Sequence, residues 1–69
     1  MSNRVYKLVE IVGTSPTSTD DAIRNAIAKA AQTLAHLDWF QVVETRGQIV
    51  DGQVAHFQVV LKVGFRLDD

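Results

Sequence analysis

The sequence predicts an α+β fold, in which a three-stranded antiparallel sheet packs on one amphipathic helix within a single domain over residues 1–69. Two observations lead to this prediction. A β-rich run precedes a segment of helical periodicity, and two further β-rich runs follow that segment and are joined at Asp51-Gly52. The element order is therefore β-α-β-β. An all-antiparallel sheet with this element order requires the strand order 1-3-2, with the last strand in the centre.

The first β-rich run covers residues 4–13 and carries apolar side chains on both of its sides. Val9 and Ile11 fall on one side, whereas Leu8 and Val12 fall on the other. A strand of this kind needs cover on both faces, and one short helix can cover only one of them.

Turn-forming residues at 13–18 precede the predicted helix. The helix is expected to begin near Thr19, because Ser18 is a suitable N-cap and acidic residues such as Asp21 follow in the first turn. Apolar residues then recur at helical spacing as far as Leu37. This stripe is expected to face the core: Ile23, Ile27, Ala30, Leu34 and Leu37. Small residues flank the stripe and would let the helix lie close to a sheet: Ala22, Ala26 and Ala31.

The polar residues on the outer side of this helix are interpreted as a solvated face: Arg24, Asn25, Lys29 and Gln32.

After the helix, Asp51-Gly52 predicts a hairpin with a type I′ turn, because both central positions of that turn need positive φ. The last β-rich run, residues 54–67, alternates cleanly. One side is predicted to face the helix: Phe57, Val59, Leu61, Val63, Phe65 and Leu67. The other side is predicted to face away: His56, Gln58, Val60, Lys62, Gly64 and Arg66.

The small size of the chain favours self-association. A domain of 69 residues buries only roughly 60% of its unfolded surface and is marginal alone. The chain has no cysteine, so disulfides and thiolate metal sites are excluded, and its two histidines cannot build a structural zinc site. A bare sheet face and two open sheet edges would also be covered in a closed homo-oligomer.

Charge and hydropathy exclude two classes of partner. A net charge of -1 argues against a general nucleic-acid binder, which is normally basic on one face. No apolar run approaches the roughly 18 residues of a membrane span, and Met1-Ser2-Asn3-Arg4 leads into a strand pattern rather than a signal peptide. We therefore expect a cytoplasmic protein without nucleic-acid or membrane partners.

No catalytic or metal-binding constellation is found in the sequence. There is no cysteine nucleophile, no glycine-rich phosphate loop and no histidine pair at i, i+4 spacing, so an enzyme is the weaker class. His36, near the predicted helix end, is interpreted as a complement to the helix dipole. His56 could be either a strand-surface residue or a ligand contact.

Trp39, the single tryptophan, follows Asp38 at the predicted junction between helix and strand. It could be either core filler or a platform for a ligand. An indole face near the amide of Gln58 and the guanidinium of Arg46 would suit a flat heteroaromatic with polar edges. Trp39 and Arg46 are an odd number of positions apart, however, so they would share a sheet face only if a β-bulge lay between them.

Four spaced motifs together resemble the dodecin family and cover nearly the whole chain in the same order. They are Val9-Glu10-Ile11-Val12-Gly13-Thr14-Ser15, Leu37-Asp38-Trp39-Phe40, Arg46-Gly47, and Phe57-Gln58-Val59 with Lys62-Val63-Gly64-Phe65-Arg66-Leu67. The resemblance implies a β-α-β-β protomer, a homododecamer of twelve copies in a hollow shell of 23 symmetry, and flavin bound between symmetry-related subunits.

The resemblance also implies roles for individual residues. Trp39 would stack on the isoalloxazine, with two flavins lying together at a two-fold axis between a pair of these tryptophans, and Gln58 would hydrogen-bond the polar edge of the ring. Arg46 resembles the residue of the bacterial branch, which favours FMN, and riboflavin or FAD are the other possible ligands. Asp38 and Arg66 match further positions of the flavin site. Coenzyme A, known at the three-fold region of bacterial members, would involve Arg4, Tyr6, Lys29, Gln32 and Thr33.

The implied function is flavin storage or sequestration. Electron transfer from Trp39 would quench the excited flavin before it generates reactive oxygen, which would be photoprotection. Two alternatives stay open: a structural homo-oligomer whose Trp39 is used in subunit contacts, and a small flavin-dependent enzyme with an open substrate position beside the ring.

Overall fold

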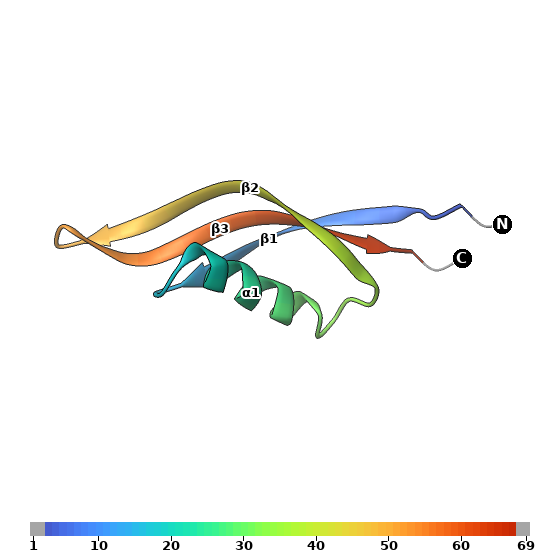
Figure 1. Ribbon diagram of the computed structural model, residues 1–69, viewed down its shortest axis with the longest axis horizontal. Coiled ribbons are helices and arrows are strands. Elements are labelled where there is room, and N and C mark those ends of the chain that lie inside the picture. The colour runs from blue at the N-terminus through green and yellow to red at the C-terminus, as the bar shows by residue number, and fades with distance from the viewer. Residues whose placement is uncertain (1–2, 68–69) are drawn as a thin grey trace.

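The chain forms three strands and one helix in the predicted order β-α-β-β. The computed structural model describes residues 3–67, so the ends of the predicted domain, including Met1 and Ser2 of the amino-terminal run, lie outside the described part. The elements are β1 (Tyr6–Ser15), α1 (Thr19–Ala30), β2 (Leu37–Val50) and β3 (Gln53–Arg66) (Figure 1). The strands pair antiparallel in the order β1-β3-β2, which confirms the predicted fold class and the central position of β3.

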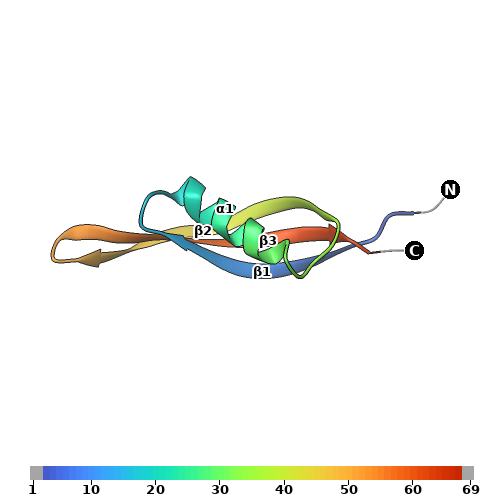
Figure 2. The ribbon, with the colours of Figure 1, turned by 90° about the horizontal axis from the view of Figure 1, so that it is seen from below.

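Helix α1 lies against one side of the sheet (Figures 1 and 2) and leaves the other side without cover from this chain. The molecule is a thin plate of 56 × 20 × 13 Å. The 12 residues of α1 span only about 18 Å, whereas the 14 residues of β3 span about 46 Å. The helix therefore covers the middle of the sheet, and the β2–β3 hairpin extends well beyond it.

The alternation of β3 places its apolar side chains as predicted where the helix is present. Val59, Leu61 and Val63 are at most 1% exposed and form the core with Ala22 and Ala26 of α1. The flanking members of the predicted row are less well covered. Phe57 and Phe65 are half-buried, and Leu67, beyond the end of β3, is exposed.

The centre of the buried helix face differs from the prediction by one residue. The most buried row consists of the alanines Ala22, Ala26 and Ala30, whereas Ile23 and Ile27 pack only partly against the core. Small side chains face the sheet because the helix lies so close to β1. A Cβ at Gly13 would overlap the carbonyl oxygen of Ala22 and lie 2.8 Å from Ala26 Cβ.

The prediction that the helix continues to Leu37 is wrong, because α1 ends at Ala30. The backbone N–H of Leu34 still donates to Ala30 O at 2.9 Å, but His36 then adopts a left-handed conformation with φ 63°. Leu37 pairs with Phe65 as the first residue of β2. Leu34 and Leu37 are half-buried whether or not they are helical, so the apolar periodicity runs past the true helix end.

His36 therefore does not have the predicted role at the helix dipole. It lies beyond the last turn of α1, and a dipole acts only within that turn. Instead, the backbone oxygen of His36 accepts a hydrogen bond from the N–H of Arg66 at 3.0 Å. This contact ties the loop after α1 to the end of β3.

The segment between β1 and α1 is shorter than predicted, because β1 continues past Gly13 to Ser15. Ser15 is buried, donates from Oγ to Asp21 Oδ2 at 2.7 Å and accepts from the N–H of Thr17 at 2.9 Å. Ser18 is the N-cap as predicted, and its Oγ accepts from the N–H of Asp21 at 3.0 Å. A short connection closed by side-chain hydrogen bonds thus places α1 directly over β1.

Strand β2 is the least covered element. Every residue from Asp38 to Val50 is exposed, and several of them are large and apolar: Trp39, Phe40, Val42, Val43, Ile49 and Val50. The turn after β2 has φ 53° at Asp51 and 75° at Gly52, which confirms the predicted hairpin. No helix in residues 3–67 is long and apolar enough to cross a membrane.

Candidate functional site

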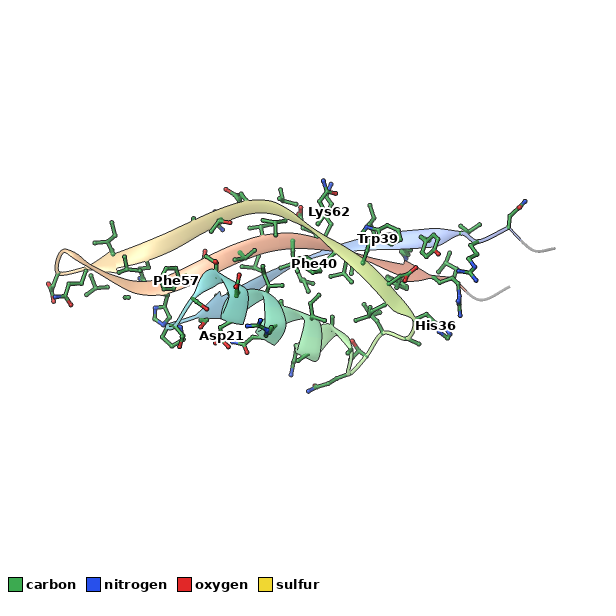
Figure 3. All side chains as sticks on the ribbon, in the orientation of Figure 1. Asp21, His36, Trp39, Phe40, Phe57 and Lys62 are labelled. Atoms are coloured by element: carbon green, nitrogen blue, oxygen red, sulfur yellow. The ribbon has the colours of Figure 1, made fainter. Side chains whose placement is uncertain are left out.

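The sheet face opposite α1, called the open face below, carries most of the residues that the sequence singled out. β3 contributes Gln58, Lys62, Gly64 and Arg66 to this face, because they alternate with the core residues. Figure 3 shows Trp39 and Lys62 on this side of the sheet, whereas Phe40 points toward α1. The open face is therefore a candidate ligand surface that the helix does not obstruct.

Trp39 lies on the open face with its ring across the central strand. It pairs with Gly64, and a Cβ added at Gly64 would overlap indole atoms Cε2 and Cζ2 and lie 2.7 Å from Cδ2. The indole also meets the ring of Tyr6 edge to face, with a centroid distance of 4.8 Å and an interplanar angle of 63°. Trp39 is still 43% exposed, so in this chain it is a surface aromatic rather than core filler.

A β-bulge at Val43 brings Trp39 and Arg46 to the same face. Val42 pairs with Leu61 and Glu44 with the next residue of β3, so Val43 has no partner of its own. Alternation resumes one position later, and Arg46 then stands opposite Gln58. A β-bulge between Trp39 and Arg46 was required for the two residues to share a sheet face, and the structure has one there.

Arg46 and Gln58 form a polar pair on the open face. Arg46 Nε donates to Gln58 Oε1 at 2.8 Å, and Arg46 Nη1 lies 3.9 Å from Glu44 Oε1. The carboxylate contact is about half exposed and contributes little. A guanidinium can only donate, so it fixes the oxygen of the Gln58 amide and leaves the Nε2 hydrogens as donors to a further group.

The indole and the polar pair lie at two distant places on one protomer. Gly64, under Trp39, and Gln58 are six positions apart along β3, which corresponds to about 20 Å. This separation exceeds the length of a three-ring aromatic system. One protomer therefore presents two separate candidate half-sites, an aromatic one and a hydrogen-bonding one.

The two other residues of the predicted flavin set lie near the Trp39 end. Asp38 is exposed and is the unpaired residue of a second irregularity, between Leu37 and Trp39. Arg66 stands opposite Tyr6 on β1, and its Nη2 is 3.4 Å from His36 Nδ1. Asp38 and Arg66 thus belong to the same end of the sheet as Trp39, at the start of β2 and the end of β3.

The residues predicted for coenzyme A are divided between the two sides of the sheet. Lys29 and Thr33 line a groove of about 430 Å³ between α1 and β1, together with Val9 and Leu34. Tyr6 is on the open face, against Trp39. The remaining two, Gln32 and Arg4, are exposed outside the helix and strands. One protomer does not bring these five residues together.

Three features of the site were not visible in the sequence. The seat of Trp39 on Gly64 and its contact with Tyr6 join residues from three strands. A groove of about 620 Å³ also lies between α1 and β2, lined by Asp20, Ile23, Arg24, Ile27, Ala28 and Phe40. The only sequence signal for this groove is that Phe40 neighbours Trp39 and so points to the opposite face. Within the described range 3–67, no group of three or more His, Cys, Asp or Glu residues could hold a metal ion.

Known proteins resemble this chain over nearly its full length. The family model described as dodecin matches residues 5–68. A dodecin from Thermus thermophilus is 54% identical over 66 residues, which is 96% of each chain. The solved dodecin from Streptomyces davaonensis is 63% identical, with a TM-score of 0.95, 99% of this chain covered and 100% of the other. The dodecin structure from Streptomyces coelicolor is 61% identical, with a TM-score of 0.95 and coverage of 100% and 99%.

Proposed function

Because the chain belongs to the dodecin family of small flavin-binding proteins, we propose that it binds FMN on the open face, stores it there and quenches its excited state. The observation that supports this proposal is the exposed Trp39 ring, held flat against Gly64 on the uncovered side of the sheet. Members of this family are ligand-binding proteins rather than enzymes. Riboflavin and FAD carry the same ring and are the alternative ligands.

Stacking on Trp39 would give both affinity and quenching. Aromatic stacking contributes about 0.5–1.5 kcal/mol beyond the burial of apolar area. An indole in van der Waals contact with an excited flavin is also an electron donor at the shortest possible range. The flavin would accept one electron from Trp39 and return it, so that excitation energy is lost as heat and neither partner is consumed.

The proposed flavin site is completed by a second copy of the chain. In one protomer, Gln58 lies about 20 Å along β3 from Gly64, the residue under Trp39, which is longer than an isoalloxazine. Trp39 from one copy and the Arg46–Gln58 pair from another would supply the stacking surface and the polar partner. Dodecins form dodecameric assemblies, and we propose a homododecamer of 23 symmetry with paired flavins at its two-fold axes.

Gln58 would recognise the carbonyl edge of the flavin. Its Oε1 already accepts from Arg46 at 2.8 Å, so its Nε2 is available to donate to a ring carbonyl oxygen.

Coenzyme A binding is proposed from the resemblance alone. The separation of Tyr6 from Lys29 and Thr33 means that more than one copy would have to contribute to that site.

Titration of the purified protein into FMN, followed by flavin emission and light scattering, tests the proposed function. We expect strong quenching that saturates near one flavin per chain, on a particle of about twelve chains as the family implies. Undiminished emission on a particle of the same mass would contradict the proposal and favour the structural homo-oligomer. Reduction of the bound flavin by a nicotinamide donor with substrate turnover would instead favour the enzyme alternative.

Replacing Gln58 with alanine should weaken FMN binding about fivefold and relax discrimination among ring analogues. The expected loss corresponds to one hydrogen bond of about 1 kcal/mol. The measurement compares dissociation constants for FMN and for an analogue that lacks the corresponding carbonyl. Gln48→Ala is the matched control, because Gln48 is an exposed amide on the same strand as Arg46 and contacts His56 at 3.3 Å. Equal ligand ranking in Gln58→Ala and wild type would remove Gln58 from the site.

A further inference from the structure

We propose that Tyr6 is a positioning residue for Trp39, which together with Gly64 fixes the plane of the indole before flavin arrives. The part of this inference that concerns flavin rests on the proposed function, but the part that concerns the indole does not. Tyr6 would not touch the ligand in this role. It would act by removing alternative orientations of the stacking surface.

The contact between Tyr6 and Trp39 spans the whole width of the sheet. Trp39 belongs to β2 and Tyr6 to β1, and β3 lies between these two strands. The indole crosses β3 at Gly64, where there is no side chain, and its ring then meets the ring of Tyr6. The centroid distance of 4.8 Å and the angle of 63° lie within the favourable range for edge-to-face pairs. The indole is thus supported from below by backbone and from the side by a second ring.

This support matters because Trp39 lies on an exposed strand and not in the core. Trp39 is at the start of an edge strand in which every residue after Leu37 is exposed, and it is outside the hydrophobic core. A tryptophan on such a strand would otherwise exchange between rotamers. A stacking surface that is already oriented loses less conformational freedom on binding, and this raises affinity without adding a contact to the ligand.

Tyr6 can be changed without removing core packing. Tyr6 is half-buried on the open face, whereas the core lies on the helix side of the sheet. The contact between Tyr6 and Trp39 is made by their two rings, and phenylalanine keeps the ring. Tyr6→Phe should therefore preserve the ring contact with Trp39, and Tyr6→Leu should remove it. Val12→Ala is the matched control, because Val12 is exposed on the same strand and face but pairs with Val60, away from Trp39.

The first readout is the time-resolved anisotropy of the indole in the flavin-free protein. Trp39 is the only tryptophan, and excitation at the red edge of its absorption excludes the single tyrosine. We expect Tyr6→Leu to increase the amplitude of the fast depolarisation several-fold, and Tyr6→Phe and Val12→Ala to match wild type. An unchanged anisotropy in Tyr6→Leu would overturn the inference. A purely structural role would change particle mass or far-ultraviolet circular dichroism instead.

The second readout is FMN binding by the same variants as assembled particles. Tyr6→Leu should raise the dissociation constant about three- to tenfold, whereas Tyr6→Phe should stay within twofold of wild type. Gly64→Ala disturbs the second support of the indole. It should raise the dissociation constant more than tenfold, because the new Cβ displaces the ring. Wild-type affinity in both Tyr6→Leu and Gly64→Ala would overturn the inference and leave the proposed function intact. Failure of wild type to bind FMN would overturn the proposed function. The anisotropy alone would then show whether Tyr6 orients the indole.

Discussion

Replacing Trp39 with alanine is expected to restore most of the emission of bound flavin and to weaken FMN binding about thirtyfold. The variant loses the stacking surface and its electron donor together, a cost of about 2 kcal/mol from stacking and apolar area. Because Trp39 is 43% exposed and lies outside the core, the change should leave no core cavity and should preserve the particle mass. Affinity and quantum yield of the bound flavin are the quantities to measure.

Trp39→Phe separates stacking from electron transfer. Phenylalanine can still stack on the flavin but is a much poorer electron donor than indole. We expect this variant to retain most of the affinity and to lose most of the quenching. If Trp39→Ala binds and quenches FMN as wild type does, the indole has no part in the site, and the exposed ring has to be assigned to contacts between copies.

Replacing Gly13 with alanine is expected to destabilise the fold by about 3 kcal/mol, near the upper end for overpacking. The added Cβ would overlap the carbonyl oxygen of Ala22, which is helix backbone and cannot rotate away. Helix α1 would have to move off the sheet, and the contacts of Ala26 with the core would loosen. In a chain of 69 residues this corresponds to a fall in Tm of about 12–24 °C, measurable by circular dichroism at fixed protein concentration.

Gly52→Ala provides the control for a glycine whose role is conformational. No atom lies within 4 Å of a Cβ at Gly52, but its φ of 75° is unfavourable for alanine. We expect a cost of about 1 kcal/mol, from the backbone alone. If Gly13→Ala melted at or above the temperature of Gly52→Ala, the close approach of α1 to β1 would not be the feature that limits stability.

The topology followed from the sequence because its signals are local. The alternation around Val59, Leu61 and Val63 and the turn at Asp51-Gly52 each depend on neighbouring residues, and the strand order then follows from chain direction. The residue at which α1 ends could not be predicted from such local signals. Leu37 suits a helix stripe as well as it suits a strand, and its pairing with Phe65, a residue far along the chain, decides between them.

The arrangement of the candidate site residues could not be predicted from the sequence, although the residues themselves were proposed from its motifs. The motifs identified Trp39, Arg46 and Gln58, yet a shared face for the first two depended on an irregularity that leaves no mark in composition. Val43 is a β-branched residue in a β-rich run, and nothing distinguishes it from a regularly paired neighbour. The contact of Tyr6 with Trp39 was equally hidden, because it depends on side-chain direction across three strands.

Because of the bulge at Val43, the proposed binding site depends on the number of residues between Trp39 and Arg46 as well as on their identity. A sequence that kept every side chain named above but lacked one residue between Trp39 and Arg46 would present the two on opposite faces of the sheet. Conversely, substitutions at Val43 leave the count unchanged and should be tolerated more readily than a deletion there. Among relatives, a gap within this short interval would therefore say more about a lost site than several changes of residue type elsewhere in the strand.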